Sequence, residues 1–114
     1  MLPLLLLASV YAAPSPARTE ALMNEIERRV ALPKGADALR AYDRGYAFAN
    51  PDKVVGIYLM RMRAGAGQMP AGRRKWYGRV ADLPFVFDGG CMQVRIEYQI
   101  STHRLLSASC NGYA

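Results

Sequence analysis

The first half of the sequence has a helical repeat of apolar residues, and the second half alternates between apolar and polar positions. Apolar side chains recur four positions apart at Leu22, Ile26 and Val30, which is the spacing of one helix face. Ser15-Pro16 provides a helix cap followed by proline at the first helical position. Pro33 disfavours helical backbone in the residue before it. We therefore predict a first helix that begins at Pro16 and ends near residue 32.

A second helix is predicted between Asp37, in its first turn, and the turn signal Asn50-Pro51-Asp52. The apolar stripe of this segment consists of Leu39, Tyr42, Tyr46 and Ala49. These positions are three or four residues apart, as on one face of a helix. Gly45 lowers the helix propensity of the segment without ending it. We therefore expect two helices before the first strand.

Four strands are predicted in the second half, where the apolar period changes to two. They cover residues 54–63, 73–80, 92–100 and 104–110. In the second of them, Trp76 faces the core and the basic side chains face the other way. The turn Asp88-Gly89-Gly90 leads into the third strand, which alternates most regularly. The predicted fold is α+β, with two N-terminal helices packed on one face of a four-stranded antiparallel sheet and one disulfide.

The first twelve residues resemble a signal peptide more than part of a domain. Leu2 to Val10 is an apolar run without a charged side chain, and Val10-Tyr11-Ala12 offers small residues at the two positions that a signal peptidase reads. The run is shorter than the stretch of about 20 residues that spans a bilayer, and no basic residue precedes it. A buried N-terminal strand is the alternative. We expect a signal peptide at 1–12, a single α+β domain at 13–114 without a transmembrane segment, and a periplasmic or secreted location.

The number and spacing of the cysteines are consistent with an exported protein. Cys91 and Cys110 are 19 positions apart, and the chain has neither a C-x-x-C motif nor clustered histidines, so a metal site is not predicted. In an oxidising compartment the two should form a disulfide. If Cys91 lies opposite Cys110 on paired strands, Tyr98 faces His103 and Ile96 faces Leu105. A bridge between loops just outside the paired strands is equally compatible with the sequence.

Several short strings resemble a group of small, uncharacterised exported proteins of proteobacteria. The strings are Leu32-Pro33-Lys34-Gly35-Ala36, Leu39-x-x-Tyr42, Val54-Val55-Gly56-Ile57-Tyr58, Leu83-Pro84, Asp88-Gly89-Gly90-Cys91 and Cys110-Asn111-Gly112-Tyr113-Ala114. The resemblance spans residues 26 to 114. It implies a periplasmic protein with a Cys91–Cys110 bridge, and it implies no activity.

The chain is basic, with 15 Lys and Arg against 9 Asp and Glu, which gives a net charge of +6. Strand alternation places much of this charge on one sheet face, opposite Trp76. The predicted ligand-binding residues on that face are Arg61, Arg63, Arg73, Lys75, Tyr77, Arg79 and Arg95. Like charges on adjacent strands destabilise a sheet, so their accumulation favours an anionic partner, which arginine contacts in a bidentate manner. A solvated, highly charged sheet face is the alternative interpretation.

The sequence predicts no catalytic residues and no cofactor. His103 is the single histidine, and Glu97, Arg95 and Arg104 lie near it in sequence, as in small ribonucleases. Such chemistry needs these groups to converge on one bound phosphate. We therefore expect a non-enzymatic exported protein that binds a polyanion, an anionic envelope component or an envelope protein. A small inhibitor of an envelope-targeting enzyme and a basic secreted nuclease are the alternatives.

Overall fold

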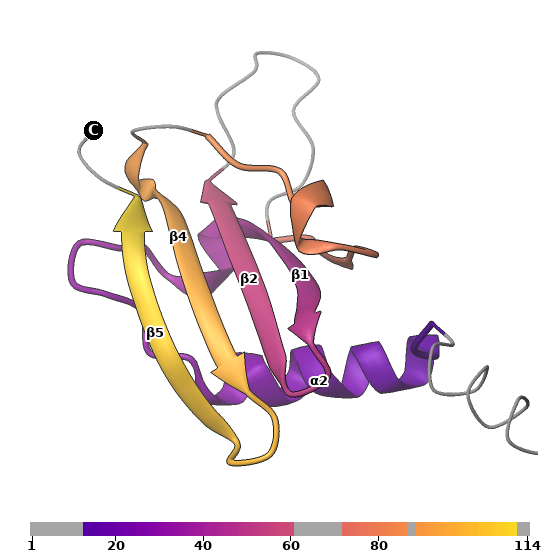
Figure 1. Cartoon of the computed structure of the whole chain (residues 1–114). Coiled ribbons are helices and arrows are strands. Elements are labelled where there is room, and N and C mark those ends of the chain that lie inside the picture. The colour runs from indigo at the N-terminus through magenta and orange to yellow at the C-terminus, as the bar shows by residue number, and fades with distance from the viewer. Residues whose placement is uncertain (1–12, 61–71, 87–88, 112–114) are drawn as a thin grey trace, which may run out of the picture.

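The computed structural model describes residues 13–60, 72–86 and 89–111. Within these ranges the chain forms one α-helix and a five-stranded sheet in the order β3-β1-β2-β4-β5 (Figure 1). The elements are α2 (Pro16–Arg29), β1 (Tyr42–Asn50), β2 (Lys53–Met60), β3 (Arg74–Trp76), β4 (Gly90–Gln99) and β5 (Arg104–Asn111), with two short 3-10 helices, η1 (Leu39–Ala41) and η2 (Val80–Asp82). The expected signal peptide, residues 1–12, lies outside the described residues.

The predicted first helix is confirmed as α2. Ser15 caps it, because its side-chain oxygen accepts a hydrogen bond from the Arg18 backbone N–H at 3.1 Å, and Pro16 follows in the first turn. The helix ends when the N–H of Val30 bonds to the carbonyl of Ile26. The buried helix residues are Thr19, Leu22, Met23 and Ile26. This face packs α2 against one side of the sheet.

The predicted second helix is wrong, because residues 42–50 form strand β1. Tyr42 and Tyr46 are four residues apart, a spacing that places them on one side of a helix and also on one side of a strand. Arg44, between them, is buried on the same side, which only the period of two allows. Pro51-Asp52 forms a two-residue turn, so β1 and β2 make a hairpin in which Asn50 pairs with Lys53. The prediction of two helices on a four-stranded antiparallel sheet is therefore corrected to one helix on five strands.

The sheet is mixed, since β1 pairs antiparallel with β2 and parallel with β3. The predicted strand 73–80 is shortened to Arg74–Trp76, and its continuation folds into η2. The predicted strand 54–63 is confirmed over its described part, as β2 ends at Met60. The last two strands form the predicted antiparallel hairpin, but with a different register. Tyr98 pairs with Leu105 instead of His103, which belongs to the turn and adopts a φ of 54°.

The main core lies between α2 and the sheet and is rich in aromatic rings. Tyr46 contacts Tyr58 edge-on at 5.7 Å between centroids, and Trp76 stacks on Tyr46 at 6.3 Å. The expectation that Trp76 faces the core is confirmed. The fully buried side chains are Tyr42, Tyr46, Tyr58, Tyr98, Ile26, Ile96, Val54, Val55 and Val94. The core rings therefore come from the neighbouring strands β3, β1 and β2, and β4 adds Tyr98.

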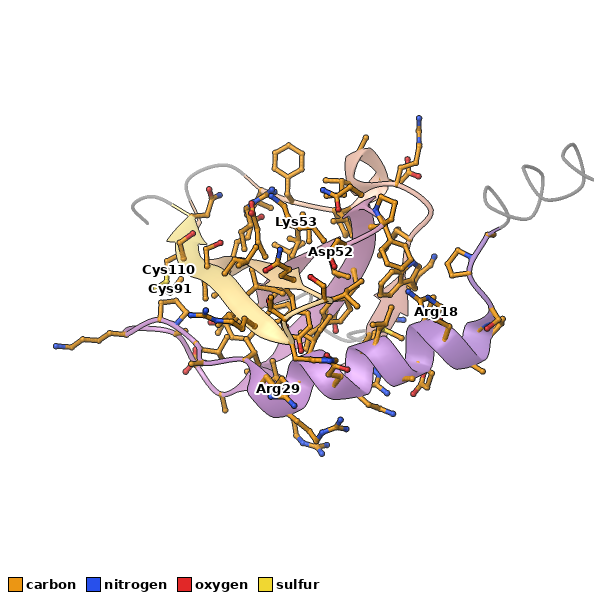
Figure 2. The ribbon with its side chains drawn as sticks, turned by 60° about the horizontal axis from the view of Figure 1, so that its bottom comes forward. Arg18, Arg29, Asp52, Lys53, Cys91 and Cys110 are labelled. Atoms are coloured by element: carbon orange, nitrogen blue, oxygen red, sulfur yellow. A yellow bond between two sulfur atoms is a disulfide. The ribbon has the colours of Figure 1, made fainter. Side chains whose placement is uncertain are left out.

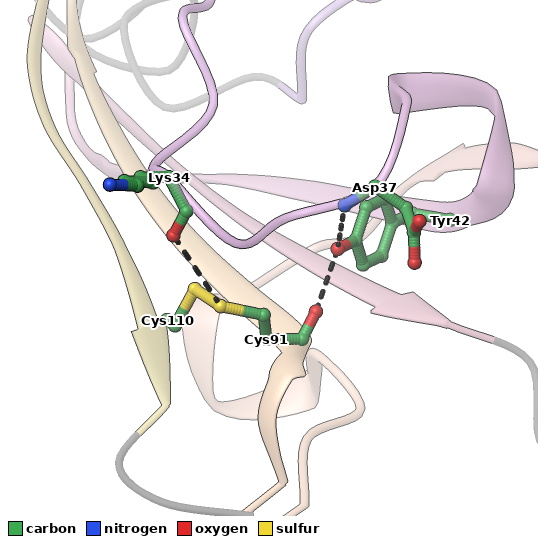
Figure 3. Close-up of a disulfide and its surroundings, with 5 residues drawn as sticks. All are labelled: Lys34, Asp37, Tyr42, Cys91 and Cys110. Atoms are coloured by element: carbon green, nitrogen blue, oxygen red, sulfur yellow. Dashed lines mark hydrogen bonds between the residues drawn. A yellow bond between two sulfur atoms is a disulfide. The ribbon is translucent and has the colours of Figure 1, made fainter.

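The predicted disulfide between Cys91 and Cys110 is present, with Cα atoms 4.6 Å apart (Figure 3). It lies in the β4–β5 ladder where the pairing skips from Gly90 opposite Asn111 to Val94 opposite Cys110. The bridge is therefore a cross-strand link at a bulge, not a link between loops. The Tyr42 hydroxyl donates to the Cys91 carbonyl at 2.6 Å and joins this end of β4 to β1.

The opposite end of the β4–β5 hairpin is held by Asp52 in the β1–β2 turn. Its carboxylate accepts hydrogen bonds from the Ser101 N–H at 2.7 Å and from the Ser101 hydroxyl at 2.8 Å. These bonds lower the pKa of Asp52 below its usual value. Figure 2 shows Asp52 and the disulfide in separate regions of the molecule. No helix within the described residues is long and apolar enough to span a membrane.

Candidate functional site

The sheet face turned away from α2 carries the candidate site. Strand alternation places Ala47, Val55 and Ile57 on this face, where they form a second buried cluster with Leu83. Leu83 reaches the sheet because residues 72–86 run beside β1 and turn at η2 (Figure 1). The described part of this segment covers the face only partly, and Leu59 on this face is half-buried.

Gly45 decides how closely the covering segment approaches β1. A Cβ atom at this position would lie 3.0 Å from Cε1 of Tyr77 and 3.1 Å from Cδ2 of Leu83. Glycine therefore lets both side chains rest directly on the strand backbone. The Tyr77 N–H donates to the Tyr46 carbonyl at 2.7 Å and fixes the segment as it leaves β3. The position of the Tyr77 ring follows from these contacts.

A groove with a volume of about 800 Å³ opens on this face. Its described lining consists of Asp43, Arg44, Gly45, Ile57, Leu59, Met60, Arg73, Arg74, Lys75, Tyr77, Pro84, Val86, Gly89 and Met92. Two of the apolar members are exposed, Val86 at 42% and Met92 at 37%. An apolar floor with a few polar groups at its edge is the usual character of a small-molecule site.

Two basic side chains stand at the edge of the groove on either side of Arg74. Arg73 is exposed, and its Nη2 lies 4.0 Å from Oδ2 of Asp43. The Lys75 ammonium lies 4.9 Å from the centre of the Tyr77 ring. Because strand alternation turns Arg74 toward α2, Arg73 and Lys75 share the open face. The groove therefore combines an apolar floor with a basic rim.

The other predicted binding residues are placed differently. Arg79 forms an ion pair with Asp82 in η2 at 2.9 Å, and this pairing raises the pKa of Arg79. Arg95 pairs with Glu97 at 3.1 Å and lines a neighbouring depression of about 340 Å³. Arg61 and Arg63 lie outside the described residues. Of the seven predicted residues, the structure brings three together at the groove: Arg73, Lys75 and Tyr77.

His103 and Glu97 do not converge in the described structure. Nδ1 of His103 lies 2.8 Å from the carboxylate of Glu25 on α2, and the Tyr98 hydroxyl donates to the same carboxylate. The Tyr98 bond and then the His103 bond lower the pKa of Glu25, while burial and this bond raise the pKa of Tyr98 to about 12. Glu97 instead bonds to Lys53 at 2.8 Å on the other sheet face. His103 thus joins the β4–β5 turn to the helix.

A buried polar network under α2 was not predicted. The Glu27 carboxylate accepts hydrogen bonds from Nε of Arg44 at 2.8 Å and from the Tyr46 hydroxyl at 2.7 Å, and Nη1 of Arg74 lies 3.3 Å away. Burial raises the pKa of Tyr46 well above its usual value, which keeps the phenol protonated as a donor. A period of two through Tyr42, Arg44 and Tyr46 was the sequence signal that could have revealed the network.

Among the described residues, no three His, Cys, Asp or Glu side chains are grouped so that they could hold a metal ion. No protein-family model, curated protein or solved structure matches the chain. The resemblance to small exported proteins therefore stays a prediction.

Proposed function

We propose that the protein is an exported, non-enzymatic binding protein whose ligand is an anionic amphiphile, the chemistry of an acyl-chain component of the cell envelope. The observation that carries this proposal is the combination, in one groove, of an apolar floor with Arg73 and Lys75 at its edge. A purely solvated basic face would have no apolar cavity beneath its charges. The apolar floor of the groove indicates that the predicted anionic partner also has a hydrophobic part.

The apolar part of such a ligand would rest on Ile57, Leu59 and Met92. Each methylene group removed from water contributes about 0.8 kcal/mol. A short acyl chain therefore supplies most of the affinity, and the exposed apolar surface of Met92 and Val86 is covered at the same time. Exposed apolar surface next to a groove is a common mark of a binding site.

The anionic head group would lie between Arg73 and Lys75. A guanidinium can donate two parallel hydrogen bonds to a carboxylate or phosphate, and an ammonium adds a point charge. Oδ2 of Asp43 lies 4.0 Å from Nη2 of Arg73, at the outer limit of an ion pair. Binding would be sensitive to salt, because both cations are solvent-exposed.

The disulfide supports the exported part of the proposal, because such bonds persist in oxidising compartments. The predicted signal peptide would direct the chain to the same place.

The test is calorimetric titration with dodecanoate, with uncharged dodecyl maltoside as the matched ligand, both below their micellar concentrations. Arg73→Gln/Lys75→Gln should weaken dodecanoate at least about tenfold, since charge-assisted hydrogen bonds contribute about 1.5–3 kcal/mol each. Arg29→Gln/Arg104→Gln removes the same charge from exposed positions elsewhere and should bind like the wild type. Equal loss in both double variants would overturn the proposed role of the rim.

A second pair of variants tests the floor. Met92→Gln should weaken dodecanoate, whereas Leu106→Gln, an exposed apolar side chain on β5 that does not line the groove, should not. Unchanged binding by Met92→Gln together with wild-type stability would place the ligand elsewhere.

A further inference from the structure

A second depression lies on the other side of the sheet, between α2, η1 and the strands β1 and β3. It has a volume of about 600 Å³. Four arginines from four different elements line it: Arg28, Arg40, Arg44 and Arg74. Four guanidinium groups around one small pocket repel one another unless anions balance them.

Two of the four arginines are neutralised within the protein. Arg44 pairs with Glu27 at 2.8 Å, and Arg74 pairs with both Glu20 and Glu27. The Glu27 carboxylate also accepts from Tyr46, so it is fully engaged by donors. Among the described residues, no carboxylate lies within ion-pair distance of Arg28 or Arg40. Within the part of the chain that the structure describes, the pocket therefore keeps two positive charges without a carboxylate partner.

Arg44 forms the inner side of the pocket. The Arg44 side chain is only 7% exposed, and its Nη1 donates to the carbonyls of Leu39 and Tyr42. Nη2 of Arg44 makes no hydrogen bond with any described residue. Gly72, with a φ of +84°, lies so close that a Cβ atom there would be 3.0 Å from the Arg40 carbonyl oxygen. This close approach places η1, and with it Arg40, beside the start of β3.

We infer that this pocket binds a phosphoryl dianion, held by Arg28 and Arg40 over the Arg44–Glu27 pair. Two uncompensated charges match a dianion better than a monoanionic carboxylate, and guanidinium groups fit phosphate oxygens in pairs. A cation is disfavoured, because the single lining carboxylate already has three donors. The pocket shares Arg44 and Arg74 with the lining of the basic-rimmed groove, but Arg28 and Arg40 line this pocket alone, and Arg73 and Lys75 line the groove alone.

In the experiment, inorganic phosphate and glycerol phosphate are titrated separately into the full chain at constant ionic strength. Binding is monitored by nitrogen–proton correlation NMR spectra. Saturable shifts should appear around residues 24–28, 39–44 and 74, and acetate should bind at least tenfold more weakly. A comparison of the two dissociation constants shows whether the pocket prefers free phosphate or an esterified head group.

Two sets of variants make the inference falsifiable. Arg28→Gln/Arg40→Gln should weaken phosphate at least tenfold, and both side chains are exposed, so the fold should persist with unchanged Trp76 fluorescence. Arg29→Gln/Arg104→Gln controls for net charge, and Arg73→Gln/Lys75→Gln should leave phosphate binding intact while impairing dodecanoate. Absence of saturable phosphate binding by the wild type, or equal binding by Arg28→Gln/Arg40→Gln, would overturn the inference.

Discussion

Replacing Glu27 by Gln should be among the most destabilising conservative changes in the chain. The substitution keeps the shape of the side chain but removes the charge that faces Arg44 and Arg74. Arg44 is almost fully buried, and the change leaves its guanidinium with only the two backbone carbonyls of η1 and β1. A buried cation that loses its partner costs about 3–5 kcal/mol.

The expected loss of unfolding free energy is about 3 kcal/mol, at the lower end of that range. Glu27 is itself 14% exposed, so water screens part of the change. The oxygen of Gln can also still accept from Tyr46, whose hydroxyl lies 2.7 Å from the carboxylate. Glu20→Gln is the matched control. Glu20 also pairs with Arg74, but its side chain is 58% exposed, and its loss should cost less than about 1 kcal/mol.

The assay is urea denaturation followed by the fluorescence of Trp76, the single tryptophan, which packs on Tyr46 next to the network. A double-mutant cycle with Arg44→Gln should give a coupling of about 1–3 kcal/mol, because removing both charges leaves neither one unpaired. If Glu27→Gln costs no more than Glu20→Gln, or if the two changes are additive, the network does not stabilise the helix on the sheet as described.

Three further changes test other parts of the structure. Cys91→Ser/Cys110→Ser should lower stability by about 3 kcal/mol in chemical denaturation, whereas an unchanged midpoint would mean that the bridge does not restrict the unfolded chain. Glu25 has a lowered pKa in the folded state, so its contribution is present above the ordinary value of about 4.3 and is lost as the pH falls through the folded value. The difference in unfolding free energy between wild type and Glu25→Gln should therefore shrink as the pH falls below the ordinary carboxyl pKa of about 4.3, and a difference that grows on acidification would contradict this sign. Trp76→Ala should cost about 2–3 kcal/mol and its exposed neighbour Lys75→Ala less than about 0.5, as measured by urea denaturation. Equal costs would mean that β3 is turned the other way.

The helix α2 and the β4–β5 hairpin could be predicted because their signals are local. A cap, a proline and one periodic stripe specify α2, and strict alternation specifies β4. The segment 42–50 could not be assigned in this way, since Tyr42 and Tyr46 fit both periods. What favours the strand there is distant in sequence: Glu27 pairs with Arg44 from the helix, and β3 adds a parallel neighbour.

The basic character of the candidate site could be predicted from the sequence, but the groove could not. Alternation alone placed Arg73, Lys75 and Tyr77 on one face, as the structure shows. The groove itself depends on Gly45, which allows Tyr77 and Leu83 to rest on β1. A glycine inside a strand carries little information about which distant side chain will approach it. The buried partners of Arg44 and Arg74 were missed for the same reason, because they come from a helix more than fifteen residues away.

The central claim, that one groove holds both the charged and the apolar part of its ligand, is tested most directly by a chain-length series. Octanoate, decanoate and dodecanoate are titrated by calorimetry into the wild type and into Arg73→Gln/Lys75→Gln. We expect about fourfold tighter binding per added methylene in both proteins, since each contributes about 0.8 kcal/mol. The double variant should follow the same slope at uniformly lower affinity. An affinity that does not change with chain length, or a variant that binds every acid as the wild type does, would contradict the account.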